Sequence, residues 1–409
     1  MQFAPRPGDP APRRIRRIGR LLAVLALAVA GIAILWVFTG IPTPVATAMD
    51  DALWAPCPAQ YAAARRAIDS ALADGYVLRP RTRFERAITC GSERRRRADF
   101  TAPTPSSAPH AVSDTLSFGV FGDGPYYPWE NSRYARLLRA VDRERPAWLL
   151  HVGDLFWRPC SDAMLSTRRR EFEAMTTPVV YVPGDNEWTD CHTRETGGFE
   201  PLERLAQLRR TLLPDATHAL GRTPMAFASQ ADQPAWGEFV EHRRWTRGRV
   251  VFATLHLVGS NNGLTPFLAR TSAHDAEVAR RTQAAVAWLG TTFDSAAAQH
   301  AGTVVLAWHG NPGFNTSTGA RRGYEKVLDA LRARAVAFTG EVLVIHGDSH
   351  QQHVDRPLVA ANGAPLANVT RLETFGSPEI GWVRVVVDTV RGTVVAMEPR
   401  LISKRALIF

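Results

Sequence analysis

Five short apolar segments of this sequence each end in a side chain that can bind a cation. The five endings are Gly122-Asp123-Gly124, Gly153-Asp154, Gly184-Asp185-Asn186-Glu187, Trp308-His309-Gly310-Asn311 and Gly347-Asp348-Ser349-His350. A single Gly-Asp pair is more often a turn than a ligand, but five such endings in one chain are hard to obtain by chance. Carboxylate and imidazole groups are metal ligands, and the glycines permit the tight turns that let them crowd together.

The segments that carry these endings alternate with helical patterns. The expected strands are 116–121, 147–152, 178–182, 249–258, 303–308 and 342–345. Amphipathic helices are expected around 134–141, around 277–289 and around 324–331. A further helix is expected to end at about residue 175. A late hairpin is expected from 383–387 and 393–397, turning at Arg391-Gly392. The pattern predicts an α/β fold with a buried, largely parallel sheet, whose strand ends form one ligand-binding edge.

In order and spacing, these motifs resemble those of the calcineurin-like metallophosphoesterase family over roughly residues 116–390. The resemblance implies a sandwich of two mixed β-sheets flanked by helices. It also implies that Asp123 is the first aspartate of the family pattern and that Asp154 bridges two metals. By the same resemblance, His309 matches the lone histidine and His350 matches the second histidine of the last motif.

Several positions depart from the family pattern. Pro125 stands where many members carry a metal-binding histidine, and Trp157 stands where the purple acid phosphatase branch has a tyrosine ligand, so no chromophoric iron site is expected. Asp185 aligns with the metal-binding asparagine, and Asn186 with the histidine that protonates the leaving group. A one-residue slip makes Asn186 the ligand instead. Asp348 replaces the first histidine of the last motif.

The resemblance implies a dinuclear centre that hydrolyses phosphoesters. Asp123, Asp154 and His350 are expected to hold one divalent cation. The ligands expected for the other are Asp154, Asp185, His309 and Asp348. Because carboxylates have replaced imidazoles, Mn²⁺ or Mg²⁺ is favoured, with Zn²⁺, Fe, Ca²⁺ or a single metal as alternatives. The rival hypothesis is a catalytically inactive member that serves as an envelope binding or scaffold module.

Asn186 is a catalytic candidate that can donate a hydrogen bond but cannot supply a proton. The leaving group must therefore be stable without protonation, or another acid must act. His192 is the first candidate for that acid and His353 is the second; a surface histidine is an equally good interpretation of His192. Arg158 and Asn311 are candidates for substrate binding, although an arginine such as Arg158 is more often simply solvated.

The N-terminal part of the chain predicts a membrane anchor. The net charge of +10 is concentrated partly in arginines before residue 21, and residues 21–38 are apolar. We expect a cytoplasmic segment over 1–20, a transmembrane helix over 21–38, a helical segment over 39–100, a linker over 101–114 and a catalytic domain over 115–409. A cleavable signal peptide ending near Ala48 is the alternative. Nucleic-acid binding is not expected, because the arginine runs lack interleaved aromatics.

This topology places a single-pass protein in a bacterial inner membrane, with the catalytic domain in an oxidising compartment. We expect Cys160 to pair with Cys191, since each lies six residues beyond a site aspartate, which leaves Cys57 for Cys90. The expected substrate is a phosphorylated small molecule, lipid or envelope component. The sequence does not fix the oligomeric state.

Overall fold

The computed structural model describes residues 114–314, 322–360 and 363–402. These residues belong to one compact unit, Ala108–Ser403. The expected anchor over 21–38, the segment over 39–100, nearly all of the linker and the Cys57–Cys90 pair lie outside the described residues. Within the described ranges, no helix is long and apolar enough to cross a membrane.

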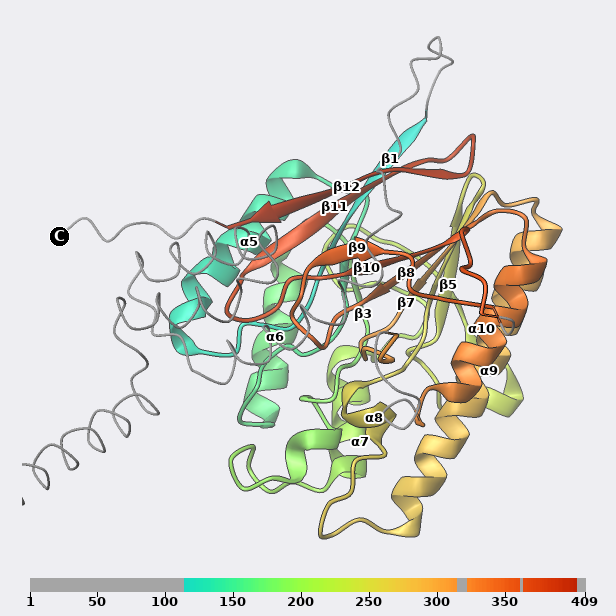
Figure 1. The fold of residues 1–409 in the computed structure, drawn as a ribbon. Helices are drawn as coiled ribbons and strands as arrows, with labels where there is room; N and C mark the ends of the chain where they lie inside the picture. The colour runs from blue at the N-terminus through green and yellow to red at the C-terminus, as the bar shows by residue number, and fades with distance from the viewer. Residues whose placement is uncertain (1–113, 315–321, 361–362, 403–409) are drawn as a thin grey trace, which may run out of the picture. The chain divides into compact units, whose positions relative to one another are not determined.

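The first of two mixed sheets contains three parallel strands and an antiparallel hairpin (Figure 1). In spatial order its strands are β12 (Thr393–Leu401), β11 (Gly381–Asp388), β1 (Thr115–Phe121), β2 (Leu149–His151) and β3 (Val179–Tyr181). Strand β2 pairs in parallel with β1 and with β3, whereas β11 runs antiparallel to β1. The carboxyl ends of β1, β2 and β3 therefore meet at one edge.

The second sheet has seven strands and a parallel centre. In spatial order they are β4 (Ala228–Ser229), β5 (Arg243–Arg247), β6 (Val250–Thr254), β7 (Thr303–Ala307), β8 (Glu341–His346), β10 (Val369–Glu373) and β9 (His353–Asp355). Strands β6, β7, β8 and β10 are parallel neighbours, and the outer strands are antiparallel. The predicted parallel sheet is thus divided between two mixed sheets, as the family resemblance implies.

The central core lies between the two sheets, where side chains such as Phe118, Trp148 and Phe252 pack edge to face or stacked. Helices α5 (Asn131–Glu144), α6 (Asp162–Ala174) and α7 (Pro201–Leu212) enclose a second core with the first sheet. Helices α9 (Ser272–Ala298) and α10 (Glu325–Ala337) enclose a third with the second sheet. The result is an α/β sandwich with helices outside both sheets.

Two elements differ in extent from the expectation. The strand expected over 249–258 ends at Thr254, because the backbone from Leu255 onward leaves the ladder and instead accepts hydrogen bonds from His309 and Gly310 at Leu257. The helix expected around 277–289 runs from Ser272 to Ala298. Element α8 (Gly259–Gly263) is a left-handed turn rather than an α-helix, since φ is 50°, 56° and 56° at Ser260, Asn261 and Asn262.

Candidate metal centre

The five strand endings come together at neighbouring edges of the two sheets. Asp123, Asp154 and Asp185 follow β1, β2 and β3 of the first sheet, while His309 and Asp348 follow β7 and β8 of the second. Two groups of side chains could each hold a metal ion, namely Asp123, Asp154 and His309, and Asp185, His309 and Asp348. The fold therefore assembles one cluster from segments spread over more than 220 residues.

His309 is the residue that the two groups share. Its Nδ1 lies 2.7 Å from the carbonyl oxygen of Val152, which fixes Nδ1 as the protonated nitrogen. Its Nε2 lies 2.8 Å from Asp185 Oδ1 and 3.3 Å from Asp154 Oδ1. Nε2 is buried and has no hydrogen-bond partner of good geometry within the described residues. An imidazole whose Nδ1 donates to a backbone carbonyl and whose Nε2 faces carboxylates is the arrangement that a metal-bound histidine adopts.

Asp154 lies at the centre of the hydrogen bonds in the cluster. Its Oδ1 accepts from the backbone N–H of Asn186 at 3.1 Å, and its Oδ2 accepts from the Asn186 side-chain amide at 2.7 Å. The hydroxyl of Tyr126 donates to the same Oδ2 at 2.5 Å. These bonds fix the orientation of the carboxylate that is expected to bridge two cations.

The remaining predicted ligands contact one another around Asp123. The backbone N–H of Asp348 donates to Asp123 Oδ1 at 2.9 Å. His350 Nε2 lies 3.6 Å from the same oxygen, and its Nδ1 lies 2.7 Å from the Ser377 carbonyl. His350 thus has its Nε2 toward the cluster, as His309 does. Asp348 accepts from the backbone N–H of Asn311 at 2.7 Å.

The backbone at the cluster is strained and closely packed. Asp123, Asp154, Asp348 and His350 adopt φ values of 56°, 56°, 76° and 60°, a left-handed conformation that is uncommon for residues other than glycine. Two glycines allow the close approach that results. A Cβ on Gly184 would lie 2.2 Å from Asp154 Oδ1, and one on Gly347 would lie 2.2 Å from Asp123 Oδ2.

Burial gives these side chains unusual proton affinities. It raises the pKa of Asp123, raises that of Asp154 well above its usual range and, together with the charge of Asp185, raises that of Asp348 to about 6. Burial also acts to raise the pKa of Asp185, but the close His309 imidazole outweighs it and lowers that pKa. For His309, burial acts to lower the pKa, yet Asp154 and the other carboxylates raise it well above 6.5. Bound positive charge would therefore stabilise the ionised carboxylates of the cluster, and divalent cations supply such charge.

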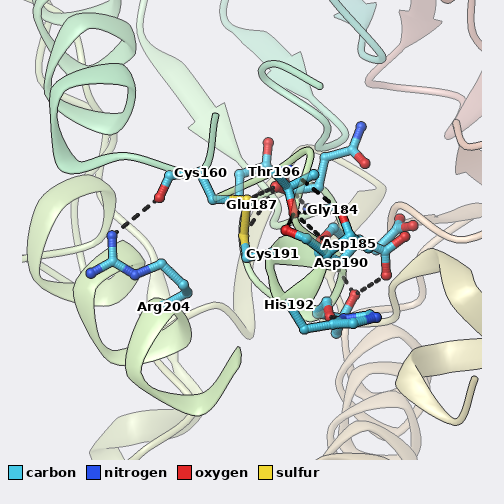
Figure 2. The surroundings of a disulfide bond; sticks show 12 residues. Cys160, Gly184, Asp185, Glu187, Asp190, Cys191, His192, Thr196 and Arg204 are labelled. Atoms are coloured by element: carbon cyan, nitrogen blue, oxygen red, sulfur yellow. Dashed lines mark hydrogen bonds between the residues drawn. A yellow bond between two sulfur atoms is a disulfide. The ribbon is translucent and has the colours of Figure 1, made fainter. Parts of the chain in front are cut away.

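A disulfide joins Cys160 to Cys191, as expected, with their Cα atoms 5.6 Å apart (Figure 2). Its sulfur atoms lie 3.1 and 3.4 Å from the carbonyl oxygen of Asn186. A disulfide sulfur carries no hydrogen, so these are packing contacts and not hydrogen bonds. The bridge therefore packs directly against the loop that carries Asp185 and Asn186.

Three predicted residues, His192, Arg158 and His353, make their contacts with residues outside the two ligand groups. The His192 imidazole stacks on Phe267 at 4.3 Å, and its Nδ1 lies 2.8 Å from the Thr189 carbonyl. It lines a small pocket that Asp190 and Ser260 also line. The guanidinium of Arg158 is exposed and lies 4.1 Å above the Trp157 ring. His353 Nδ1 lies 3.6 Å from Glu373.

We expected no role for four groups that contact the cluster. Tyr126 joins Asp154 to His350, whose Nε2 is 3.2 Å from the hydroxyl. The backbone N–H of Gly259 donates to Asp185 Oδ1 at 3.1 Å. The buried carboxylate of Glu187 binds backbone N–H groups of two site loops. Burial and the charge of Asp185 raise the pKa of Asp190 to about 7, and Ser260 donates to it at 2.8 Å. Of these four, only Glu187 and Asp190 could have been noticed in the sequence, because they are acidic residues close to Asp185.

A search of curated proteins finds no match. Among solved structures, a dimetal phosphatase from Danio rerio is 13% identical with a TM-score of 0.44, covering 70% of this chain and 98% of that one. A novel phosphatase from Mycoplasma pneumoniae is 9% identical with a TM-score of 0.34, covering 72% and 97%.

The family assignment rests on a match to a family model. The model of the calcineurin-like phosphoesterase family matches residues 110–352, which is more than half of the chain and includes all five strand endings. The chain therefore belongs to the calcineurin-like phosphoesterase family and is a hydrolase acting on phosphoester bonds.

Proposed function

We propose that this hydrolase works through two divalent cations held where the two sheets meet. The observation that carries the proposal is the position of His309 Nε2. Its other nitrogen is bound to a backbone carbonyl, and Nε2 itself faces Asp154 and Asp185 without a hydrogen bond of good geometry to any described residue. Because this imidazole belongs to both ligand groups, it adjoins both proposed positions.

The described side chains fit such a centre. By the family resemblance, Asp123, Asp154 and His350 would hold one cation, and the other would be held by Asp154, Asp185, His309 and Asp348. The two groups of close ligand atoms share His309 and leave out His350, whose Nε2 lies 3.6 Å from Asp123 Oδ1. Divalent cations in such a centre supply Lewis acidity toward phosphoryl oxygens and lower the pKa of bound water. Four carboxylates against two imidazoles form an oxygen-rich ligand set, which supports Mn²⁺ or Mg²⁺ over Zn²⁺.

Asn186 and Tyr126 supply neutral donors beside the centre. The Asn186 amide is fixed by its contact with Asp154 and can orient a phosphoryl oxygen, but it has no proton to give to a leaving group. Burial and the charge of Asp154 raise the pKa of Tyr126 well above 10, so its hydroxyl stays a hydrogen-bond donor at neutral pH. We therefore propose substrates whose leaving group is stable without protonation, such as a phosphate or an aryl oxide.

The proposed location is outside the cytoplasm, with the chain anchored by residues 21–38. Support comes from the apolar run itself and from the Cys160–Cys191 disulfide, since such bonds persist in oxidising compartments. A phosphorylated small molecule, lipid or envelope component would be the substrate there. Alkaline or carbonate extraction of membranes tests the anchor, because a peripheral protein would leave the membrane.

The activity test uses the full-length chain, purified free of metal. Hydrolysis of bis-p-nitrophenyl phosphate and p-nitrophenyl phosphate is measured with Mn²⁺, Mg²⁺, Zn²⁺ and Ca²⁺ added singly. We expect turnover with Mn²⁺ or Mg²⁺ that Asp154→Asn abolishes. Asp329→Asn is the matched control, because this carboxylate is exposed and pairs with Arg332 one turn along α10. Metal-dependent stabilisation without turnover would instead support an inactive binding module, which the Asn186 replacement would explain.

A further inference from the structure

A group of aromatic side chains, of which Trp129 is exposed, lies on the two loops that follow Asp123 and Asp154. The indole of Trp129 stacks on Tyr127, with ring centroids 4.6 Å apart and an interplanar angle of 6°. The edge of Trp157 meets Tyr127 at 5.7 Å, and Arg158 lies over Trp157 at 4.1 Å. We call Tyr127, Trp129, Trp157 and Arg158 the aromatic cluster.

The cluster is held close to the proposed ligands by two loops. Tyr127 follows Tyr126, whose hydroxyl contacts Asp154, and Trp157 lies three residues after Asp154. Three residues span at most about 11 Å. Both loops leave the carboxyl ends of the parallel neighbours β1 and β2. A substrate whose phosphoryl group is at the metal centre therefore has the cluster within reach of its remaining part.

A buried carboxylate fixes the loop that presents the aromatic rings. Glu130 is completely buried, and its Oε2 accepts from the backbone N–H of Tyr126 at 2.7 Å and of Tyr127 at 3.3 Å. Its Oε1 accepts from the Ser377 hydroxyl at 2.7 Å. The rings are thus preorganised, which reduces the entropy lost when a ligand stacks on them.

The exposure of Trp129 and Arg158 argues against a purely structural role for the cluster. Trp129 is 57% exposed, whereas five other tryptophans of the described chain are at most 2% exposed. Those five are Trp148, Trp188, Trp288, Trp308 and Trp382. Arg158 is also exposed, and no carboxylate among the described residues forms a salt bridge with it. The cluster offers an indole face together with a free positive charge.

We propose that the aromatic cluster binds the base of a nucleotide substrate, with Arg158 near its anionic part. This inference rests on the proposed function and names the substrate class of the same site. A flat ring beside a phosphate is the ligand that matches an exposed indole and an arginine together, since bases stack on aromatic side chains and arginine pairs with phosphate. A sugar phosphate or a lipid headgroup lacks the flat ring.

The test compares adenosine 5′-monophosphate with ribose 5-phosphate, which differ only in the base. Each is measured as a competitive inhibitor of bis-p-nitrophenyl phosphate hydrolysis by the full-length chain with Mn²⁺. We expect the nucleotide to inhibit at least about fivefold more tightly, which corresponds to the lower end of the range for stacking of one base. Trp129→Ala should reduce that ratio to below about twofold without changing inhibition by ribose 5-phosphate.

The control is Trp236→Ala, which removes another tryptophan that lies under an arginine, Arg280, at 4.2 Å. It should leave the ratio unchanged. Equal inhibition by the two compounds in the unmodified protein, or a ratio that survives Trp129→Ala, would overturn the inference while leaving the hydrolase intact. Hydrolysis of neither p-nitrophenyl ester with any cation would instead defeat the proposed function. A thermal unfolding midpoint for Trp129→Ala equal to that of the unmodified protein confirms that the variant folds.

Discussion

The buried carboxylate of Glu187 accepts a hydrogen bond from the backbone N–H of Asp154 at 3.3 Å. It also accepts from the backbone N–H groups of Gly184, at 3.0 Å, and of Leu155. Glu187 is completely buried, and burial raises its pKa to about 7. One side chain therefore ties the loop after β2 to the loop after β3 and holds two proposed ligands in register.

Glu187→Ala should destabilise the fold as well as the site. Three buried N–H groups would lose their acceptor, and each unsatisfied donor costs about 1–3 kcal/mol. We expect the free energy of unfolding, measured by urea denaturation, to fall by about 3 kcal/mol or more. Glu173→Ala, which removes an exposed carboxylate paired with Arg169 on α6, should cost less than about 1 kcal/mol. Equal losses in the two variants would contradict this role.

Gly259→Ala should weaken metal binding by direct crowding. A Cβ at this position would lie 2.4 Å from Asp185 Oδ1 and 2.7 Å from Asp348 Oδ1. Displacing both carboxylates should lower Mn²⁺ affinity at least tenfold, the range seen when groups that orient ligands are removed, as measured by isothermal titration calorimetry. Gly237→Ala is the control, since its nearest neighbour would be 3.9 Å away. An affinity within twofold of the unmodified protein for Gly259→Ala would refute the crowding argument.

His242 should make the fold sensitive to acid. Burial lowers its pKa from 6.5 to about 3, so the folded protein keeps this imidazole neutral while the unfolded chain takes up a proton below pH 6.5. The stabilisation is complete above pH 6.5 and is lost as the pH falls toward 3. Linkage gives a loss of about 2 kcal/mol between pH 7 and pH 5 from this residue.

Urea denaturation of His242→Gln at the two pH values tests this effect. The difference in unfolding free energy between pH 7 and pH 5 should shrink by about 2 kcal/mol relative to the unmodified protein. The matched control is His218→Gln, because the His218 side chain is 53% exposed. An unchanged difference in His242→Gln would show that this imidazole does not titrate as its burial requires.

The disulfide should stabilise both the fold and the metal centre. It closes a segment of 31 residues, for which loop entropy gives about 4 kcal/mol. Replacing Cys160 and Cys191 together with alanine should lower the free energy of unfolding by a similar amount and should weaken Mn²⁺ binding, because the bridge contacts the Asn186 carbonyl. A loss below about 1 kcal/mol would indicate that the unfolded chain is not restricted by the bridge.

The sequence predicted the ends of the parallel strands well because buried parallel strands are continuous apolar runs followed by glycine and aspartate. It missed β5 (Arg243–Arg247), β9 (His353–Asp355) and the parallel strand β10 (Val369–Glu373). These segments mix apolar with polar or charged residues, and no Gly-Asp pair follows them. Helix α7 was also missed, although Glu200 caps its first turn through the N–H of Glu203.

Some contacts of the site could not be predicted from the sequence, because they join segments that lie far apart along the chain. Tyr126 is 28 residues from Asp154 and 224 residues from His350, and no local pattern joins the three. The left-handed turn at Ser260–Asn262 was expected only as an ordinary Asn-Gly turn. Its role in bringing the Gly259 N–H to Asp185 depends on the packing of the two sheets.

The number of bound cations tests the central claim most directly. The full-length chain, loaded with Mn²⁺ and freed of excess metal, is analysed by mass spectrometry of its metal content. We expect about two Mn²⁺ per chain, at most one in Asp154→Asn and about two in Asp329→Asn. No bound cation in the unmodified protein, or an unchanged number in Asp154→Asn, would contradict a dinuclear centre bridged by Asp154.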